Sequence, residues 1–155
     1  MKRLTSLLAL CVLLPALAHS RQVTLSTTLK NPEGDGAYLA IYLTDANGAY
    51  ASTLWVAGRK AKYYKHLTDW NRLSAGDGRR LQGITGASAG AGRILKVTTD
   101  LADALIDAGY EIRVDVSAED MDDSPSEIRV PLSSAQAGQP QAGTQFIQSF
   151  MVQLQ

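Results

Sequence analysis

One stretch of the chain decides the fold: residues 37–56 read AYLAIYLTDANGAYASTLWV. The first part, 37–44, is apolar or aromatic on both faces, and Asp45-Ala46-Asn47-Gly48 then supplies turn residues before a second apolar run at 50–56. Two such runs joined by a turn of this kind are typical of a β-hairpin. The stretch therefore predicts a hairpin at the centre of a β fold.

Strand patterns flank this hairpin on both sides. Residues 22–30 alternate apolar and polar side chains, which is the period of a half-buried strand. Similar patterns resume later in the chain at 93–98, 109–117, 127–132 and 144–154. About seven strands separated by turn clusters predict a mainly β fold, an immunoglobulin-like antiparallel β-sandwich with one short helix.

The alternation within the strands also predicts the core. In the strand at 109–117, apolar side chains face one way, while Glu111, Arg113 and Asp115 face the other. A turn or a short helical turn is expected at 100–108. The predicted core comprises Leu25, Leu39, Ile41, Leu43, Leu54, Leu67, Trp70, Ile112, Val114 and Val116.

Between residues 59 and 74 the apolar spacing changes to threes and fours. The residues that recur at this spacing are Tyr63, Leu67, Trp70 and Leu73. Such spacing predicts a short helix with these side chains on one face, so we expect Tyr63 and Trp70 to pack between helix and sheet. The spacing leaves Tyr64 and Trp55 open, either as core residues or as a stacking surface for a flat ring such as flavin.

The N-terminal residues 1–20 predict a leader. They carry Lys2 and Arg3, then an apolar run, then a small-residue exit, which is typical of a Sec-type signal peptide cleaved after Ala18 or after Ser20. The apolar run is shorter than the roughly 20 residues that span a bilayer, which argues against an uncleaved membrane anchor. No later stretch is apolar enough to span, so we expect no transmembrane segment in the mature chain. Residues 21–155 are then expected to form a single β-sandwich domain.

The composition argues against several classes of function. Losing Lys2 and Arg3 from the 15 basic residues leaves 13 against 15 acidic ones. A nucleic-acid partner would require a concentrated basic face, so we expect none. Cys11 is the only cysteine and leaves with the leader. The mature domain therefore has no disulfide, no thiolate nucleophile and no cysteine metal ligand.

Two groups of residues are candidates for a metal site. His66 with Asp69 offers a single imidazole, which makes a poor transition-metal site without cysteine or a second secure histidine. The acidic loop from Glu119 to Glu127 offers oxygen ligands for Ca²⁺, yet it lacks the ligand order that wraps a loop around one ion. We expect a solvated histidine, a solvated acidic loop and no metal site.

Residues 75–92 contain six glycines, which predicts a long loop of the kind that often carries function. The segment Gly86-Ala87-Ser88-Ala89-Gly90 matches the G-x-S-x-G elbow of serine hydrolases. That elbow joins a strand to a helix and requires a later histidine, whereas a β pattern follows here and His66 precedes Ser88. A serine hydrolase is therefore only the third hypothesis.

The same loop also offers groups that could bind a partner. Arg79 and Arg80 would be the anchoring cations, and the small segment Thr85-Gly86-Ala87-Ser88 would let backbone amides approach a partner or a phosphate closely. The loop is then the predicted functional face, and the alternative is a disordered insert without a role.

The order of these landmarks resembles the domain-of-unknown-function 2271 family of predicted bacterial periplasmic proteins. The likeness covers roughly residues 22–154 and is most specific in the hairpin, the helix that carries Tyr63 and Trp70, and the loop around Thr85 to Ser88. The resemblance implies a periplasmic protein found beside membrane flavin or haem reductases with PepSY-type segments. It thus implies an association with extracytosolic electron transfer or iron acquisition.

The loop is also similar to the motif on which flavin transferases attach FMN through a phosphoester. Thr85, Gly86, Ala87 and Ser88 fit that motif, with Ser88 as the attachment point, while Gln82 replaces the motif's aspartate. The tight glycine turn between two elements is the alternative.

Two functional hypotheses remain. The first is a non-enzymatic accessory protein that engages an inner-membrane PepSY-type reductase or another envelope protein. The second is a flavin-carrying electron-transfer protein with FMN on Ser88 and Trp55 or Tyr64 beside it.

Overall fold

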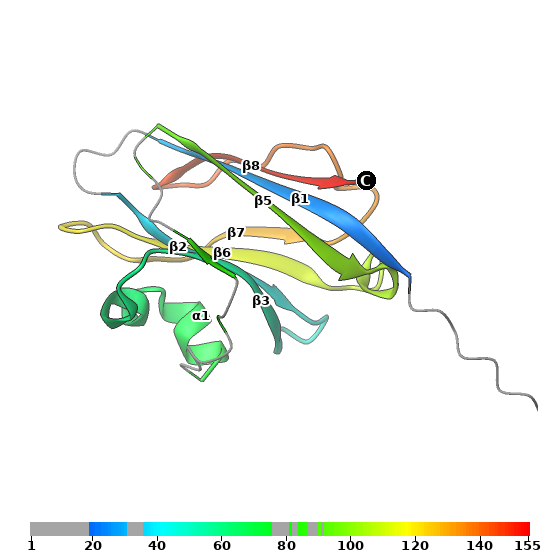
Figure 1. The fold of residues 1–155 in the computed structure, drawn as a ribbon, viewed down its shortest axis with the longest axis horizontal. Coiled ribbons are helices and arrows are strands. Elements are labelled where there is room, and N and C mark those ends of the chain that lie inside the picture. Colours follow the sequence, from blue (N-terminus) through cyan, green and yellow to red (C-terminus); the bar gives the residue numbers. More distant parts are fainter. Residues whose placement is uncertain (1–18, 31–35, 76–80, 82–83, 87–89, 91) are drawn as a thin grey trace, which may run out of the picture.

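Two β-sheets pack face to face in the computed structural model, which describes residues 19–30, 36–75, 81, 84–86, 90 and 92–155 (Figure 1). The first sheet has three antiparallel strands in the order β5 (Ile94–Ala102), β1 (Ser20–Leu29), β8 (Ile147–Leu154). The second has five, in the order β4 (Thr85–Gly86), β3 (Tyr50–Ala57), β2 (Tyr38–Thr44), β6 (Glu111–Ser117), β7 (Ser124–Pro131). The predicted mainly β sandwich is confirmed.

The predicted hairpin lies at the centre of the second sheet, where β2 pairs with β3 on one side and with β6 on the other. The Asp45 side chain explains the turn between the two strands. Its Oδ1 accepts hydrogen bonds from the backbone N–H groups of Asn47, at 2.8 Å, and Ala49, at 2.9 Å, and Gly48 takes a φ of +80°. This local bonding is typical of a tight Asx turn.

The strand order is partly immunoglobulin-like. The order β8-β1-β5 corresponds to strands A, B and E of an immunoglobulin domain, and β7-β6-β2-β3 corresponds to G, F, C and C′. No described strand occupies position D beside β5, and the short edge strand β4 pairs parallel with β3. A further difference is that position A is filled by β8, which follows the other strands in the chain. The central strand β1 therefore completes its sheet with strands that come much later in the sequence.

The core comprises the residues that the sequence predicted. All ten predicted core residues are buried, with an exposed fraction of 5 % or less. Eight of them belong to the cluster between the two sheets, while Leu67 and Trp70 belong to a second cluster on the outer face of the five-stranded sheet. Figure 1 shows the helical segment covering that face.

The helical segment is two short helices rather than one. A 3-10 helix, η1 (Ala61–His66), precedes the α-helix α1 (Thr68–Leu73). A 3-10 helix has three residues per turn, so Tyr64, Leu67 and Trp70 share the buried face. The expectation that Tyr63 packs in the core is wrong, because the α-helical spacing assumed for it does not apply within η1; Tyr63 is half-buried.

Two further regions differ from what the pattern alone suggests. Asp115 lies on the opposite face of its strand from the apolar side chains, as predicted, but it is fully buried rather than solvated because α1 covers that part of the sheet. The strand predicted at 93–98 is longer and ends at Ala102. The turn predicted at 100–108 therefore begins later, with a short 3-10 turn at Asp103–Leu105. In the described ranges, no helix is both long and apolar enough to cross a membrane.

Candidate functional site

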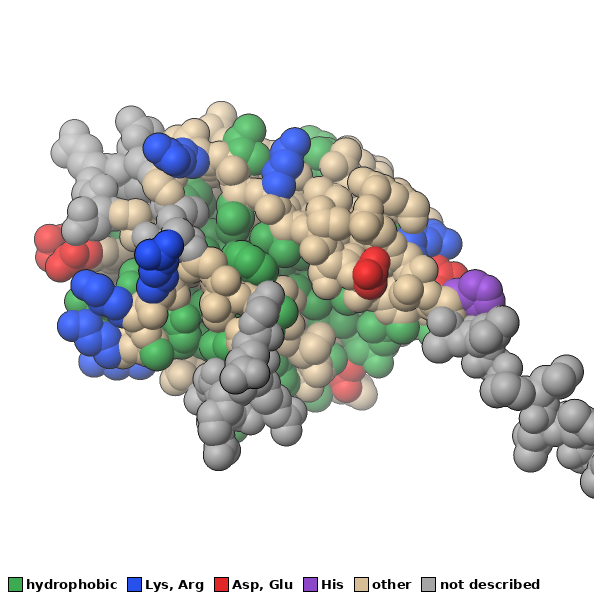
Figure 2. All heavy atoms as spheres, in the orientation of Figure 1, with side chains coloured by type: hydrophobic (Ala, Val, Ile, Leu, Met, Phe, Trp, Pro, Cys, Tyr) green, Lys and Arg blue, Asp and Glu red, His purple; other side chains and the backbone are tan. Residues whose placement is uncertain are grey.

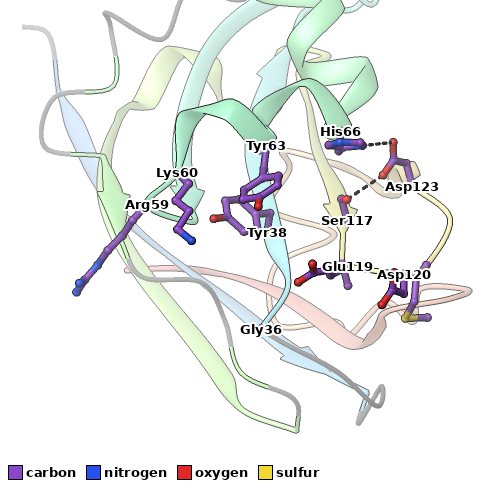
Figure 3. A pocket seen from close by; sticks show the side chains of 12 residues that line it. Gly36, Tyr38, Arg59, Lys60, Tyr63, His66, Ser117, Glu119, Asp120 and Asp123 are labelled. Atoms are coloured by element: carbon purple, nitrogen blue, oxygen red, sulfur yellow. Dashed lines mark hydrogen bonds and ion pairs between the residues drawn. The ribbon is translucent and has the colours of Figure 1, made fainter.

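A hollow of about 740 Å³ lies between η1 and the segment that joins β6 to β7 (Figure 3). We call it the η1 pocket. Three parts of the chain form it: the start of β2, the residues from the end of β3 through η1, and the β6–β7 turn. Its lining comprises Gly36, Tyr38, Arg59, Lys60, Tyr63, His66, Ser117, Ala118, Glu119, Asp120, Met121 and Asp123.

Two tyrosine rings form the middle of the η1 pocket. Tyr38 from β2 and Tyr63 from η1 meet edge to face, with ring centroids 5.4 Å apart. Gly58 makes this arrangement possible, because a Cβ at this position would overlap the Tyr38 ring and its φ of +127° suits glycine. The rings thus offer an apolar surface that the backbone of β3 holds in place.

Opposite charges line the two sides of this surface. Arg59 and Lys60 lie on the η1 side, and Glu119 and Asp120 lie on the β6–β7 side (Figure 3). All four are exposed, and none forms an ion pair with another described residue. In Figure 2, Lys and Arg side chains gather with acidic ones at the same end of the molecule. The pocket thus offers charges of both signs to a ligand.

A hydrogen-bonded chain of three side chains borders the pocket. The Ser117 hydroxyl donates to Oδ1 of Asp123 at 2.8 Å, and Oδ2 of Asp123 lies 3.2 Å from Nδ1 of His66. In a catalytic triad the imidazole lies between hydroxyl and carboxylate, so that it can take the hydroxyl proton. Here the carboxylate lies in the middle, and no imidazole adjoins the Ser117 hydroxyl among the described contacts. The chain ties η1 to the β6–β7 turn.

This pairing differs from the one considered in the sequence. His66 contacts Asp123, which is distant in sequence, rather than Asp69. Asp69 instead accepts hydrogen bonds from Ser126, at 2.7 Å, and Arg72, at 3.0 Å. Burial acts to raise the pKa of Asp69, but these two bonds, together with the positive charges of Arg72 and Arg129, outweigh it and hold the pKa below its ordinary value. No local sequence signal pointed to Asp123 as the partner of His66.

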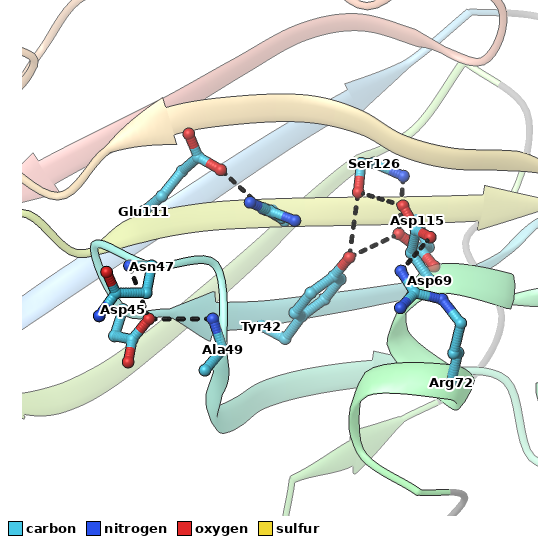
Figure 4. Close-up of polar contacts among 10 residues, drawn as sticks. Tyr42, Asp45, Asn47, Ala49, Asp69, Arg72, Glu111, Asp115 and Ser126 are labelled. Atoms are coloured by element: carbon cyan, nitrogen blue, oxygen red, sulfur yellow. Dashed lines mark hydrogen bonds and ion pairs between the residues drawn. The ribbon is translucent and has the colours of Figure 1, made fainter.

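A buried carboxylate holds the helical wall of the pocket onto the sheet (Figure 4). Oδ2 of Asp115 accepts from the backbone N–H of Trp70 at 2.8 Å, inside the first turn of α1. Its Oδ1 accepts from the Tyr42 hydroxyl at 3.0 Å and from the backbone N–H of Ser126 at 2.7 Å. Burial raises the pKa of Asp115, against the lowering effect of the hydrogen bonds that Asp115 accepts, and burial also raises the pKa of Tyr42.

Two carboxylates of the acidic loop, those of Glu127 and Asp123, also accept hydrogen bonds from other parts of the chain. Oε1 of Glu127 accepts hydrogen bonds from three successive backbone N–H groups, those of Gln145, Phe146 and Ile147, at 2.7–3.0 Å. Asp123 is engaged with Ser117 and His66, as described. The residues that the structure describes contain no group of three or more His, Cys, Asp or Glu side chains arranged to hold a metal ion.

The described part of the predicted T-G-A-S loop lies next to the pocket wall. Thr85 and Gly86 form the short strand β4 beside β3, and the Gly86 carbonyl accepts a hydrogen bond from the N–H of Gly58 at 2.9 Å. A Cβ on Gly86 would come within 2.6 Å of the Trp55 ring. Nε1 of Trp55 is buried and has no hydrogen-bond partner among the described atoms.

Other predicted site residues are placed differently. Tyr64 is 9 % exposed, donates its hydroxyl to the Gly58 carbonyl at 2.7 Å and meets the Trp70 ring edge to face. Its ring thus packs within the second cluster. Ala87 and Ser88, and the two cations Arg79 and Arg80, lie outside the described residues.

Comparison with known proteins yields one match. A family model described as "Predicted periplasmic protein (DUF2271)" matches residues 20–149. No curated protein and no solved structure matches the chain.

Proposed function

Because the chain belongs to the DUF2271 family of predicted periplasmic proteins, we propose that it is a non-enzymatic accessory protein of an extracytosolic redox or iron-acquisition system. Its partner is an inner-membrane PepSY-type reductase or another envelope protein of such a system. The η1 pocket is the surface that receives a segment of this partner.

The observation that carries the proposal is the pair of charged walls on either side of two tyrosine rings, whose charges form no described ion pairs. Arg59 and Lys60 line one side of the hollow and Glu119 and Asp120 line the other, without described ion pairs of their own. Exposed charges arranged in this way steer a complementary partner and fix its register. Aromatic rings between them supply the contact area on which binding energy concentrates.

The polar groups of the pocket favour binding over catalysis. Asp123 accepts a hydrogen bond from the Ser117 hydroxyl and also holds His66, so these three side chains serve to fix the pocket's shape. A nucleophile would require a base that receives its proton. Among the described side chains, the charged residues on the two walls have no base of this kind as a partner.

Site-specific photo-cross-linking in living cells tests the proposal. A photoreactive phenylalanine analogue replaces Tyr63 in the pocket and, as a control, Tyr110, which is also half-buried but lines a different hollow. Cells are grown with limiting iron, and adducts are identified by mass spectrometry. We expect the Tyr63 position to capture an inner-membrane protein of a redox or iron-uptake system, and the Tyr110 position not to capture it.

Charge reversal on the acidic wall provides the matched test. The double substitution Glu119→Lys with Asp120→Lys should reduce the Tyr63 adduct, because the exposed charges on the two walls would then have the same sign. Equal adducts from both tyrosine positions would refute the pocket as the docking site. A single adduct to an envelope-assembly protein would refute the redox or iron association.

A second candidate function is that of a flavin-carrying electron-transfer protein with FMN joined to Ser88. The position of Trp55 favours it, because this indole lies against Gly86, two residues before Ser88, with its N–H unpartnered among the described atoms. That N–H would donate to an acceptor on the flavin. After co-expression with a flavin transferase, the protein should be yellow and heavier by one FMN less water. Ser88→Ala should abolish both changes, and Ser117→Ala should abolish neither; a colourless protein of unchanged mass rejects this candidate.

A further inference from the structure

The edges of the two sheets are protected to different degrees. An unprotected edge strand offers its backbone to another strand, and proteins block such edges with short strands, prolines, bulges or a covering segment. Among the described residues, β4 is only two residues long, and β7 contains Pro125 and Pro131 with a register shift against β6. The segment 138–143 covers β8, with reciprocal 2.8 Å hydrogen bonds between Gln141 and Phe150.

Within the described part of the chain, the edge formed by β5 has none of these devices. The strand has nine residues and no proline, and it pairs with β1 from Ser20↔Ala102 to Thr28↔Ile94 without a register shift. At its outer face Ile94 is 60 % exposed. Figure 1 shows β5 at the margin of its sheet, with β1 on its other side.

The sequence of β5 is complementary to itself when it runs antiparallel to a second copy. If Thr98 stands opposite Thr98 of the second copy, Lys96 stands opposite Asp100, and this pair occurs twice. These side chains lie on the exposed face, and directly opposed charges of unlike sign stabilise a strand pair. A shift of register in either direction removes both ion pairs.

The charges at these two positions have no partner within the described part of the protein. Lys96 pairs across the ladder with Ser26, and Asp100 pairs with Gln22, so their neighbours on β1 are uncharged. Neither residue forms a described ion pair. On the opposite, core-facing side the same register places Leu95 opposite Leu101.

We propose that β5 is a self-association edge. Two copies of this chain pair their β5 strands antiparallel about a two-fold axis at Thr98, so that the two three-stranded sheets join into one continuous sheet. Such an interface is isologous, since Lys96 of each copy faces Asp100 of the other. A second copy is the occupant because its strand supplies the opposite charge at both positions.

Charge reversal tests this proposal by analytical ultracentrifugation of the mature protein. The unsubstituted protein should show a reversible monomer–dimer equilibrium. Lys96→Asp and Asp100→Lys each set like charges opposite each other twice, so each should raise the dissociation constant of the dimer roughly tenfold or more. Mixed in equal amounts, the two variants should form a heterodimer as stable as the original dimer, because one strand then carries an acid at both positions and the opposing strand carries a lysine at both.

Matched measurements make the outcome decisive. Lys65→Asp makes the same charge change on the exposed side of η1 and should leave the dimer unchanged. Circular dichroism checks that each variant is folded, and native mass spectrometry distinguishes the heterodimer by mass. An unsubstituted protein that stays monomeric at the highest attainable concentration overturns the proposal, as does a mixture of the two variants that fails to associate. A dimer that Lys65→Asp also dissociates overturns it too.

Discussion

Removing the Asp115 carboxylate should loosen the helical wall of the η1 pocket from the sheet. Asp115→Ala leaves two backbone N–H groups, those of Trp70 and Ser126, buried without their acceptor. Each unsatisfied buried donor costs about 1–3 kcal/mol, so the free energy of unfolding should fall by about 2–5 kcal/mol. The Tyr42 hydroxyl adds little to this loss, because Oγ of Ser126 lies 3.2 Å away and can accept its proton.

The isosteric substitution separates the charge from the hydrogen bonds. In Asp115→Asn the side-chain oxygen can still accept from Tyr42 and Ser126, while the amide nitrogen would face the N–H of Trp70, donor against donor. Burial raises the pKa of Asp115, so the charged form is costly in the folded protein, and the neutral side chain recovers part of the loss. We therefore expect Asp115→Asn to cost about 1–3 kcal/mol, less than Asp115→Ala.

Urea denaturation followed by circular dichroism measures both effects. The midpoint should fall while the slope with denaturant stays constant, which is the sign of a change in stability alone. Asp122→Ala, in the exposed acidic loop, is the control and should change stability by no more than about 0.5 kcal/mol. A loss below about 1 kcal/mol for Asp115→Ala, or an equal loss for alanine and asparagine, would refute the reasoning.

Three further predictions concern the support of the pocket and the edge of the sandwich. Ser126→Ala removes a hydrogen bond that keeps the pKa of Asp69 low in the folded protein. A lowered pKa contributes stability that is present above the pKa of the unfolded chain, 3.8, and is lost as the pH falls through the pKa of the folded protein. The stability deficit of Ser126→Ala should therefore be largest at neutral pH and shrink on acidification, as urea titrations across pH will show; a deficit independent of pH contradicts this. Gly58→Ala should lower the free energy of unfolding by more than about 2 kcal/mol, because the new Cβ overlaps the Tyr38 ring at a φ of +127°. Gly138→Ala, at φ +75° with no atom within 4 Å, should lower it by only about 1 kcal/mol, and thermal unfolding compares the two variants. Glu127→Ala removes the acceptor of three backbone N–H groups and should cost about 3 kcal/mol or more, while Glu127→Gln, which keeps one oxygen, should cost about 1 kcal/mol; equal losses in denaturant titrations would argue against the role of Oε1.

The residues that could be predicted from the sequence are those whose environment depends on strand periodicity. Alternation identified Ile112, Val114 and Val116 as core, and the turn residues after Thr44 identified the hairpin. Both features depend on neighbours a few residues away. Period-two patterns also report which side chains share a face, whatever packs on that face.

The residues that could not be predicted depend on contacts between distant segments. Asp115 looked solvated because its strand alternates, and nothing local indicates that α1 covers its outer face. Tyr64, whose role the spacing left open, is buried in place of Tyr63 because η1 turns every three residues rather than every 3.6. The spacing to Leu67 and Trp70 fits both kinds of helix over so short a segment. The bond between His66 and Asp123 joins elements that meet only in the folded chain.

The replacement of a first strand by β8 also has a consequence for secretion. A periplasmic polypeptide that crosses the membrane with its N-terminus leading delivers β1 first, yet Val23 pairs with Leu154, and Leu25 pairs with Val97 and Val152. The sheet around β1 cannot close until β8 has emerged, so folding on the far side must wait for nearly the whole described chain. Pairings this distant in sequence also form slowly. Until β5 has emerged, β1 lacks both of the strands with which it pairs in the folded sheet.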